Sequence, residues 1–208
     1  MTTDDQGGGT TPRRAELDRE TRETRVHVRL ALDGTGQVEV ATGIGMFDHL
    51  ITSMAYHGGL DLELQASGDL DVDEHHTVED VALSLGQALS AALGDRVGIE
   101  RFGEASVPMD EALARAALDL SGRPYAILRL PLVGERIGGL PTQLIPHALE
   151  SFARTSGSTL HLRASGRNDH HIAEAAFKAV GRALRQAVAL DPRRSGVPSI
   201  KGTLERPA

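Results

Sequence analysis

Four stretches of the chain carry apolar residues at intervals of three and four, the spacing of an amphipathic helix. We expect these helices at about 47–56, 75–93, 144–152 and 170–190. Shorter stretches with alternating apolar and polar residues predict strands at 24–32, 37–41, 60–64, 113–120, 123–130 and 160–162. Asp33-Gly34 and Ser121-Gly122 indicate turns. Because helices and strands do not alternate strictly, the pattern favours an α+β fold over a doubly wound sheet.

The chain also contains an internal repeat. The heptad LELQASG at 62–68 returns as LHLRASG at 160–166, with five of seven residues identical. The same offset lays His49 on His147, and Gly59 on Gly157. Downstream, three extra residues in the first copy shorten the offset, which then pairs His75 with His170, His76 with His171, Glu79 with Glu174, and Gly86 with Gly181. We predict an internal duplication: one compact domain built from two similar halves, 13–110 and 111–208.

Segment 1–12 has no apolar run, and we expect it to be a disordered tail. The sequence shows no signal peptide and no stretch near the roughly 18 apolar residues of a membrane helix. It has no Cys, which excludes disulfides, thiolate-bound metals and a Cys nucleophile, and favours a cytoplasmic location. A net charge of −7 argues against a nucleic-acid or anionic-membrane surface.

Histidine is unusually frequent, with nine His against six aromatic residues. It is the commonest metal ligand, so this surplus directs attention to a metal site. His75 and Glu79 lie four residues apart on a predicted helix and share a face, so they can bind one cation together, and His170 with Glu174 repeats the arrangement.

The other repeated histidines extend this site. His76 and His171 point about 100° away from their neighbours on a helix of 3.6 residues per turn, so each would serve a different ion. One further His per copy, His49 and His147, gives six His and two Glu, enough for two ions. The remaining histidines have no counterpart in the repeat and are interpreted as structural: His27, His57 and His161. Asp80 falls opposite Ala175, so we interpret it as a first-turn acid that complements the helix dipole.

Imidazole and carboxylate ligands without thiolate suit Mn, Fe, Co, Ni or Zn, and the spacing alone does not choose among them. The pattern is not H-E-x-x-H, which excludes the usual zinc metalloprotease. An all-helical di-iron protein is excluded by the predicted strands.

Motifs in this order resemble imidazoleglycerol-phosphate dehydratase, an enzyme family of histidine biosynthesis. The resemblance extends from about Leu17 to Leu204 and is carried by FDH at 47–49, EHHTVEDV at 74–81, LDLSGRPY at 118–125, SGSTLH at 156–161, HHIAEA at 170–175 and PSIKG at 198–202. It implies the monofunctional form of the enzyme, and a fold of two α/β halves, like domain 2 of ribosomal protein S5, related by a pseudo-twofold axis.

The resemblance further implies two Mn(II) ions per active site. Its ligand positions are the eight residues selected by the duplication. By resemblance, one ion takes His75, Glu79, His147 and His171, and the other takes His49, His76, His170 and Glu174. Some ligands are then supplied by a neighbouring chain, because the family forms a shell of 24 subunits.

The implied reaction converts imidazole glycerol phosphate to imidazole acetol phosphate and water. The proton is lost from a carbon with no carbonyl beside it, so no ordinary enolate can form. The substrate's imidazole, bridged between two cations, becomes acidic enough to expel the adjacent hydroxyl and give a diazafulvene. The resemblance assigns the acid–base role to Glu23.

The phosphate of the substrate requires cationic donors, and the chain has no P-loop. By family position these groups, with Glu23, contact the substrate: Arg101, Arg123, Lys178, Ser199 and Lys201. Arg193-Arg194 is interpreted as surface charge. Two other functions remain open: a two-metal hydrolase acting on a phosphate or amide, and a metal-binding assembly without enzymatic activity.

Overall fold

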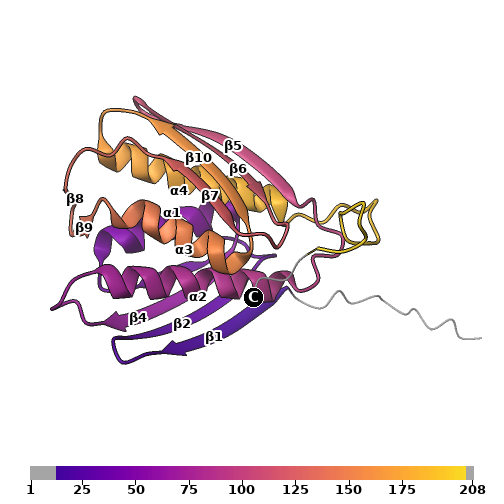
Figure 1. Ribbon diagram of the computed structural model, residues 1–208, viewed down its shortest axis with the longest axis horizontal. Coiled ribbons are helices and arrows are strands. Elements are labelled where there is room, and N and C mark those ends of the chain that lie inside the picture. The colour runs from indigo at the N-terminus through magenta and orange to yellow at the C-terminus, as the bar shows by residue number, and fades with distance from the viewer. Residues whose placement is uncertain (1–12, 205–208) are drawn as a thin grey trace, which may run out of the picture.

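Two four-stranded sheets enclose the helices of the chain (Figure 1). The computed structural model describes residues 13–204, so the tail predicted at 1–12 lies outside the described residues. The first sheet has the order β1-β2-β4-β3, with β1 at Arg14–Glu20, β2 at Thr24–Ala31, β4 at Asp61–Gly68 and β3 at Val38–Ala41. The second has the order β5-β6-β10-β7, with β5 at Phe102–Met109, β6 at Ala112–Asp119, β10 at Thr159–Ser165 and β7 at Tyr125–Arg129.

The two sheets share one topology, which supports the predicted duplication. In each, the first three strands are antiparallel, and the last pair, β3 with β4 or β7 with β10, is parallel. A small hairpin of β8 (Arg136–Ile137) and β9 (Leu140–Pro141) stands apart from both sheets. The fold is α+β with two similar halves, as the sequence predicts.

Four helices lie between the sheets in the described part of the chain: α1 (Gly45–Gly58), α2 (His75–Leu93), α3 (Leu144–Ser156) and α4 (Asp169–Ala187). Each long helix packs on the sheet of its own half, α2 on the first and α4 on the second. Each also packs on the short helix of the other half, so that α2 meets α3 and α4 meets α1. The buried apolar residues form one cluster that runs through both halves.

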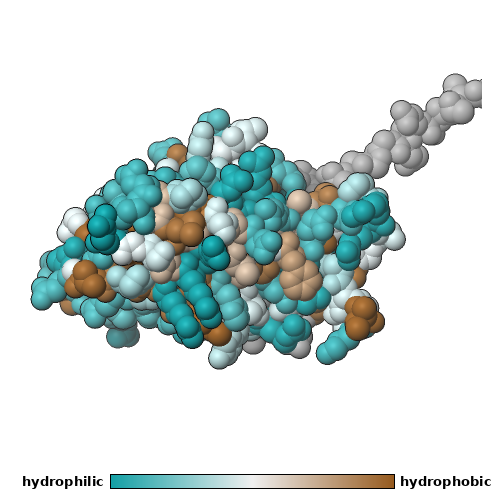
Figure 2. Space-filling model, turned by 90° about the horizontal axis from the view of Figure 1, so that it is seen from above, coloured by the Kyte–Doolittle hydropathy of each residue, from teal (hydrophilic) through white to brown (hydrophobic). Residues whose placement is uncertain are grey.

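The apolar side chains of the central strands face this helical layer. In β2, Val26, Val28 and Leu30 are buried and alternate with more exposed residues. Figure 2, which views the molecule from above Figure 1, shows a mainly hydrophilic surface with separate apolar spots. No helix within 13–204 has the length and apolar content that crossing a bilayer requires.

Glycines at equivalent positions permit this packing. A Cβ at Gly181 of α4 would lie 2.1 Å from the Met54 carbonyl oxygen in α1, and one at Gly86 of α2 would lie 2.5 Å from the Phe152 carbonyl oxygen in α3. Without a side chain, each long helix approaches the backbone of its partner. These glycines are the pair that the repeat aligned.

Four features differ from the sequence-based expectation. Strands β1 and β5 and the short hairpin of β8 and β9 were not predicted; β1 and β5 are edge strands, and the alternation of β1 rests on few apolar residues. β5 pairs with β6 in the second sheet, although it lies upstream of the boundary predicted at residue 110. The prediction of a helix to Leu190 was too long, because α4 ends at Ala187 and Leu190 forms a bridge with Ile99.

Asp80 is the fourth difference. It is not a first-turn acid but lies in the second turn of α2, where it is buried. Arg19 of β1 donates to its carboxylate at 2.9 Å, and the Thr24 hydroxyl donates to it from β2. Asp80 therefore joins α2 to the first sheet.

Candidate metal centre

The first cluster of potential ligands combines a helix from each half. His170 and Glu174 lie one turn apart on α4, and His49 reaches them from the first turns of α1. The Nε2 atoms of His49 and His170 lie 2.9 and 3.0 Å from the same oxygen, Oε2 of Glu174. We call these three residues the α1–α4 cluster.

The second cluster has the same composition with the halves exchanged. His75 and Glu79 come from α2, and His147 comes from α3. The Nε2 atoms of His75 and His147 each lie 3.8 Å from an oxygen of Glu79, and the two imidazole rings stack with centroids 4.8 Å apart. We call this set the α2–α3 cluster. In both clusters the potential ligand atoms lie within 4.8 Å of one another, close enough to share an ion.

The α2–α3 cluster contains a nitrogen atom whose environment suits a metal ligand. His147 Nε2 is buried and has no hydrogen-bond partner among the described residues. Leaving a buried polar atom unsatisfied costs about 1–3 kcal/mol, which a coordinated cation would offset. Two imidazoles and one carboxylate per cluster are the donor set that suits Mn(II) and related ions.

Glu174 is held ionised in the α1–α4 cluster. Its side chain is only 9 % exposed, and burial by itself would raise the pKa. Hydrogen bonds from Lys178, whose Nζ lies 2.6 Å from Oε1, and from His49 outweigh burial and bring the pKa of Glu174 to about 2. Glu174 is therefore a carboxylate at neutral pH, the form that binds a cation. In the other cluster, Arg154 donates to Glu79 at 3.1 Å.

His76 and His171 lie outside both clusters in the described chain. His76 Nδ1 is 3.0 Å from an oxygen of Asp69, and His171 Nδ1 is 2.8 Å from an oxygen of Glu111. These carboxylates raise the pKa of each histidine. Each cluster thus brings together three of the four ligands that the family resemblance assigns to one ion.

Glu23 lies beside His76 and away from the other predicted substrate contacts. It directly precedes β2, its side chain is 53 % exposed, and Oε2 is 3.8 Å from His76 Nδ1. Its backbone N–H donates to the Thr21 hydroxyl, which fixes the turn but leaves the carboxylate accessible.

The predicted phosphate contacts divide between two places. Arg101 lies at the carboxyl end of α4, where its backbone N–H donates to Ala187. Its guanidinium donates to Asp119 at 2.7 and 3.0 Å and to the Pro198 carbonyl at 2.9 Å. Arg123 also approaches Asp119, at 3.8 Å. The segment after Pro198 carries Ser199 and Lys201, whereas Lys178 lies beside the α1–α4 cluster, in contact with Glu174.

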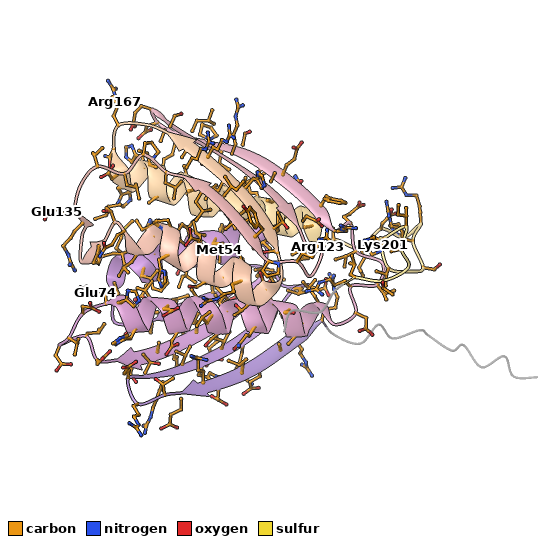
Figure 3. The ribbon with its side chains drawn as sticks, in the orientation of Figure 1. Met54, Glu74, Arg123, Glu135, Arg167 and Lys201 are labelled. Atoms are coloured by element: carbon orange, nitrogen blue, oxygen red, sulfur yellow. The ribbon has the colours of Figure 1, made fainter. Side chains whose placement is uncertain are left out.

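The two clusters lie at one end of the molecule, and four of the predicted phosphate contacts, Arg101, Arg123, Ser199 and Lys201, lie at the other. Figure 3 shows Arg123 and Lys201 at one end, and Glu74, which directly precedes His75, at the other. Ala187 lies 17 residues after His170 on α4, a rise of roughly 25 Å at 1.5 Å per residue. A substrate of a few carbon atoms cannot reach from the two clusters to these four residues of the same chain.

Sequence reasoning missed three carboxylates that organise the site: Asp69, Glu111 and Asp119. One signal for Glu111 was available, because it directly precedes β6 as Glu23 directly precedes β2. Nothing in the local sequence distinguishes Asp69 or Asp119 from a surface acid.

Residues 42–184 match the family model for imidazoleglycerol-phosphate dehydratase. The enzyme of that name from Moorella thermoacetica is 55 % identical over 193 residues, which cover 92 % of this chain and 98 % of the relative. The chloroplastic enzyme of Pisum sativum is 53 % identical and is matched over 69 % of its length.

Solved structures show the same relationship. The Pyrococcus furiosus enzyme, in complex with (S)-C348, superposes with a TM-score of 0.78 at 36 % identity, over 90 % of this chain and all of the other. The Staphylococcus aureus enzyme gives a TM-score of 0.76 at 32 % identity, over 85 % of this chain and 98 % of the other.

Proposed function

The chain belongs to the imidazoleglycerol-phosphate dehydratase family and is a dehydratase of histidine biosynthesis, and we propose that its active site uses two Mn(II) ions and residues from more than one chain. The reaction removes water from imidazole glycerol phosphate and gives imidazole acetol phosphate. The observation that carries the proposal is the pair of His/Glu clusters, each formed by a helix from each half. We propose a cytoplasmic location, as expected for a cysteine-free biosynthetic enzyme.

The proposed ions are held by the two clusters, each with one more histidine from a neighbouring chain. His75, Glu79 and His147 would bind one ion with His171 of a neighbour, and His49, His170 and Glu174 would bind the other with a neighbour's His76. The support is geometric: within one chain each cluster has three donors, and the fourth predicted ligand lies elsewhere.

Sharing between chains is also supported by the distance within one chain. Apart from Lys178, the proposed phosphate contacts stand at the other end of the molecule from both clusters, so a second chain would have to supply them (Figure 3). A closed assembly in which ends of different chains meet would satisfy this requirement. The 24-subunit shell implied by the family is such an assembly.

When bound at the two clusters, two divalent ions would act as Lewis acids toward the imidazole of the substrate, which would lower the pKa of its ring N–H and favour loss of the adjacent hydroxyl. The chain's own residues then have to move protons and hold the substrate. Glu23 has an accessible carboxylate beside a predicted ligand, His76. It is positioned to take the C–H proton and to return a proton to the substrate.

The phosphate would be held at the far end of the site by cationic groups. Hydrogen bonds to Asp119 and to the Pro198 carbonyl already orient the guanidinium of Arg101. The bond to Pro198 also fixes the start of the segment that carries Ser199 and Lys201. Such a preorganised guanidinium binds phosphate with little loss of side-chain entropy. Holding the phosphate at one end fixes the imidazole against the metal ions at the other.

The direct test is to incubate the Mn(II)-loaded protein with imidazole glycerol phosphate and to follow products by mass spectrometry. We expect a ketone product lighter by one water. Release of inorganic phosphate without ketone would instead indicate the two-metal hydrolase.

The Glu23→Gln variant distinguishes a dehydratase from a metal-binding assembly without enzymatic activity. We expect it to retain wild-type metal content and to lose turnover by about 100-fold or more, the usual contribution of a general acid–base. Wild-type turnover in this variant would contradict the role of Glu23. Elemental analysis of the purified protein identifies the ion and gives the number bound per chain.

A further inference from the structure

His76 and His171 are equivalent in the repeat, and each has one ring nitrogen held by a carboxylate. Nδ1 of His76 lies 3.0 and 3.3 Å from the two oxygens of Asp69, and Nδ1 of His171 lies 2.8 Å from Glu111 Oε2. An ionised carboxylate only accepts hydrogen bonds, so in both rings Nδ1 is the donor, and in the neutral ring Nε2 then carries the free lone pair.

Glu111 is fixed from two sides. Its Oε1 accepts the backbone N–H groups of Arg167 at 3.0 Å and Asn168 at 2.8 Å, and its Oε2 faces His171. Arg167 and Asn168 lead into α4, which begins at Asp169. The glutamate therefore ties the turn before β6 to the start of the helix that carries His171.

In the first half, a carboxylate from a different position contacts the histidine. The position that directly precedes β2 is Glu23, which remains 3.8 Å from His76, and Asp69 from the loop after β4 makes the close contact instead. In the second half, the residue that follows β10 and its glycine is Arg167, which offers a backbone N–H to Glu111 and no carboxylate. One carboxylate per half makes the close contact with the histidine, and Glu23 stays farther from His76 than Asp69 does.

We propose that Asp69 and Glu111 are positioning residues that hold the Nδ1–H of His76 and His171, so that Nε2 is presented to a metal ion bound mainly by another chain. This inference rests on the proposed function. Carboxylates that accept the second N–H of a metal-binding histidine fix its tautomer and ring orientation and make the other nitrogen a better ligand. These separate roles also explain why the two equivalent glutamates differ in their contacts. Glu111 holds the proposed ligand His171, whereas Glu23 is available for proton transfer.

The test compares Asp69→Asn and Glu111→Gln with Glu150→Gln, which changes an exposed carboxylate on α3. Mn(II) affinity is measured by chelator competition, and the visible spectrum of the Co(II)-substituted protein reports coordination. We expect the two site variants to bind Mn(II) about 10- to 100-fold more weakly, with altered Co(II) spectra. The control keeps wild-type values.

Melting of the metal-free proteins distinguishes positioning from folding. We expect metal-free Asp69→Asn to have the same melting temperature as the metal-free wild type, because the effect of the substitution acts through the ion. Wild-type Mn(II) affinity and Co(II) spectra in both site variants would overturn the inference. If the wild-type protein itself binds no divalent ion or forms no ketone, the proposed function fails instead, so the two failures are distinct.

Discussion

The backbone carbonyl of Met54 in α1 lies directly against Gly181 in α4, where an added Cβ would be only 2.1 Å from the oxygen. This contact sets the distance between the helices that carry His49 and His170. We expect Gly181→Ala to lower the free energy of unfolding by about 1–3 kcal/mol, the usual cost of overpacking. Separation of α1 from α4 should also reduce metal content. Thermal unfolding measures the loss of stability, and elemental analysis measures the loss of metal.

Gly45→Ala is the control for this substitution. Gly45 begins α1, and no heavy atom of another segment lies within 4 Å of the Cβ that alanine would add there. Because alanine favours helix, this variant should be as stable as the wild type or more so. Equal stability of Gly181→Ala and the wild type would contradict the close approach of the two helices.

Removing one histidine from a cluster should remove its ion. We expect His170→Ala to empty the α1–α4 cluster and His75→Ala to empty the α2–α3 cluster, with a weaker assembly in both cases. His161→Ala, which changes an exposed histidine on β10, should keep both ions. Elemental analysis and sedimentation measure the outcome, and full occupancy in both cluster variants would exclude the two-site arrangement. Treatment of the wild type with a chelator should reproduce the loss of assembly.

Two inactive variants should restore activity when their chains assemble together. His75→Ala damages the metal end of a chain, and Arg101→Ala damages the phosphate end. If each active site takes its metal cluster and its phosphate contacts from different chains, mixed assemblies contain some sites with both ends intact. Co-refolding followed by an activity assay measures this effect. Mixed assemblies as inactive as the parents would show that each chain forms its own site.

Asp191 should contribute stability that disappears in acid. The side chain and backbone N–H of Arg193, with Arg194, hold the pKa of this carboxyl well below its usual range. A carboxyl with a lower pKa in the folded state stabilises the fold above its unfolded pKa, about 3.9, and loses this effect as the pH falls further. Metal-free Asp191→Asn should therefore melt below the wild type at pH 7, with the difference shrinking below about pH 4. A difference that stays constant with pH would contradict this prediction.

Much of the fold could be predicted because it depends on local periodicity. The helix at 75–93 was predicted at its observed bounds, since its apolar residues repeat at helical spacing against one sheet. Gly59 and Gly157, aligned by the repeat, both end a helix in the left-handed conformation, at φ values of 67° and 65°. The edge strand β1 was missed because one of its inward-facing residues is Arg19, a charged residue that is half-buried and pairs with Asp80.

The sequence by itself determined the duplication, the α+β class and the eight residues proposed to bind metal, since the repeat aligns equivalent residues and the spacing of apolar residues records which side chains share a face. Only the tertiary structure decided that His49 joins Glu174 across the two halves, that His76 and His171 stay outside both clusters, and that Arg123 and Lys201 lie at the far end. These relationships depend on which helix surfaces fit together, as Gly181 fits against Met54, and no local pattern encodes the partner of a surface.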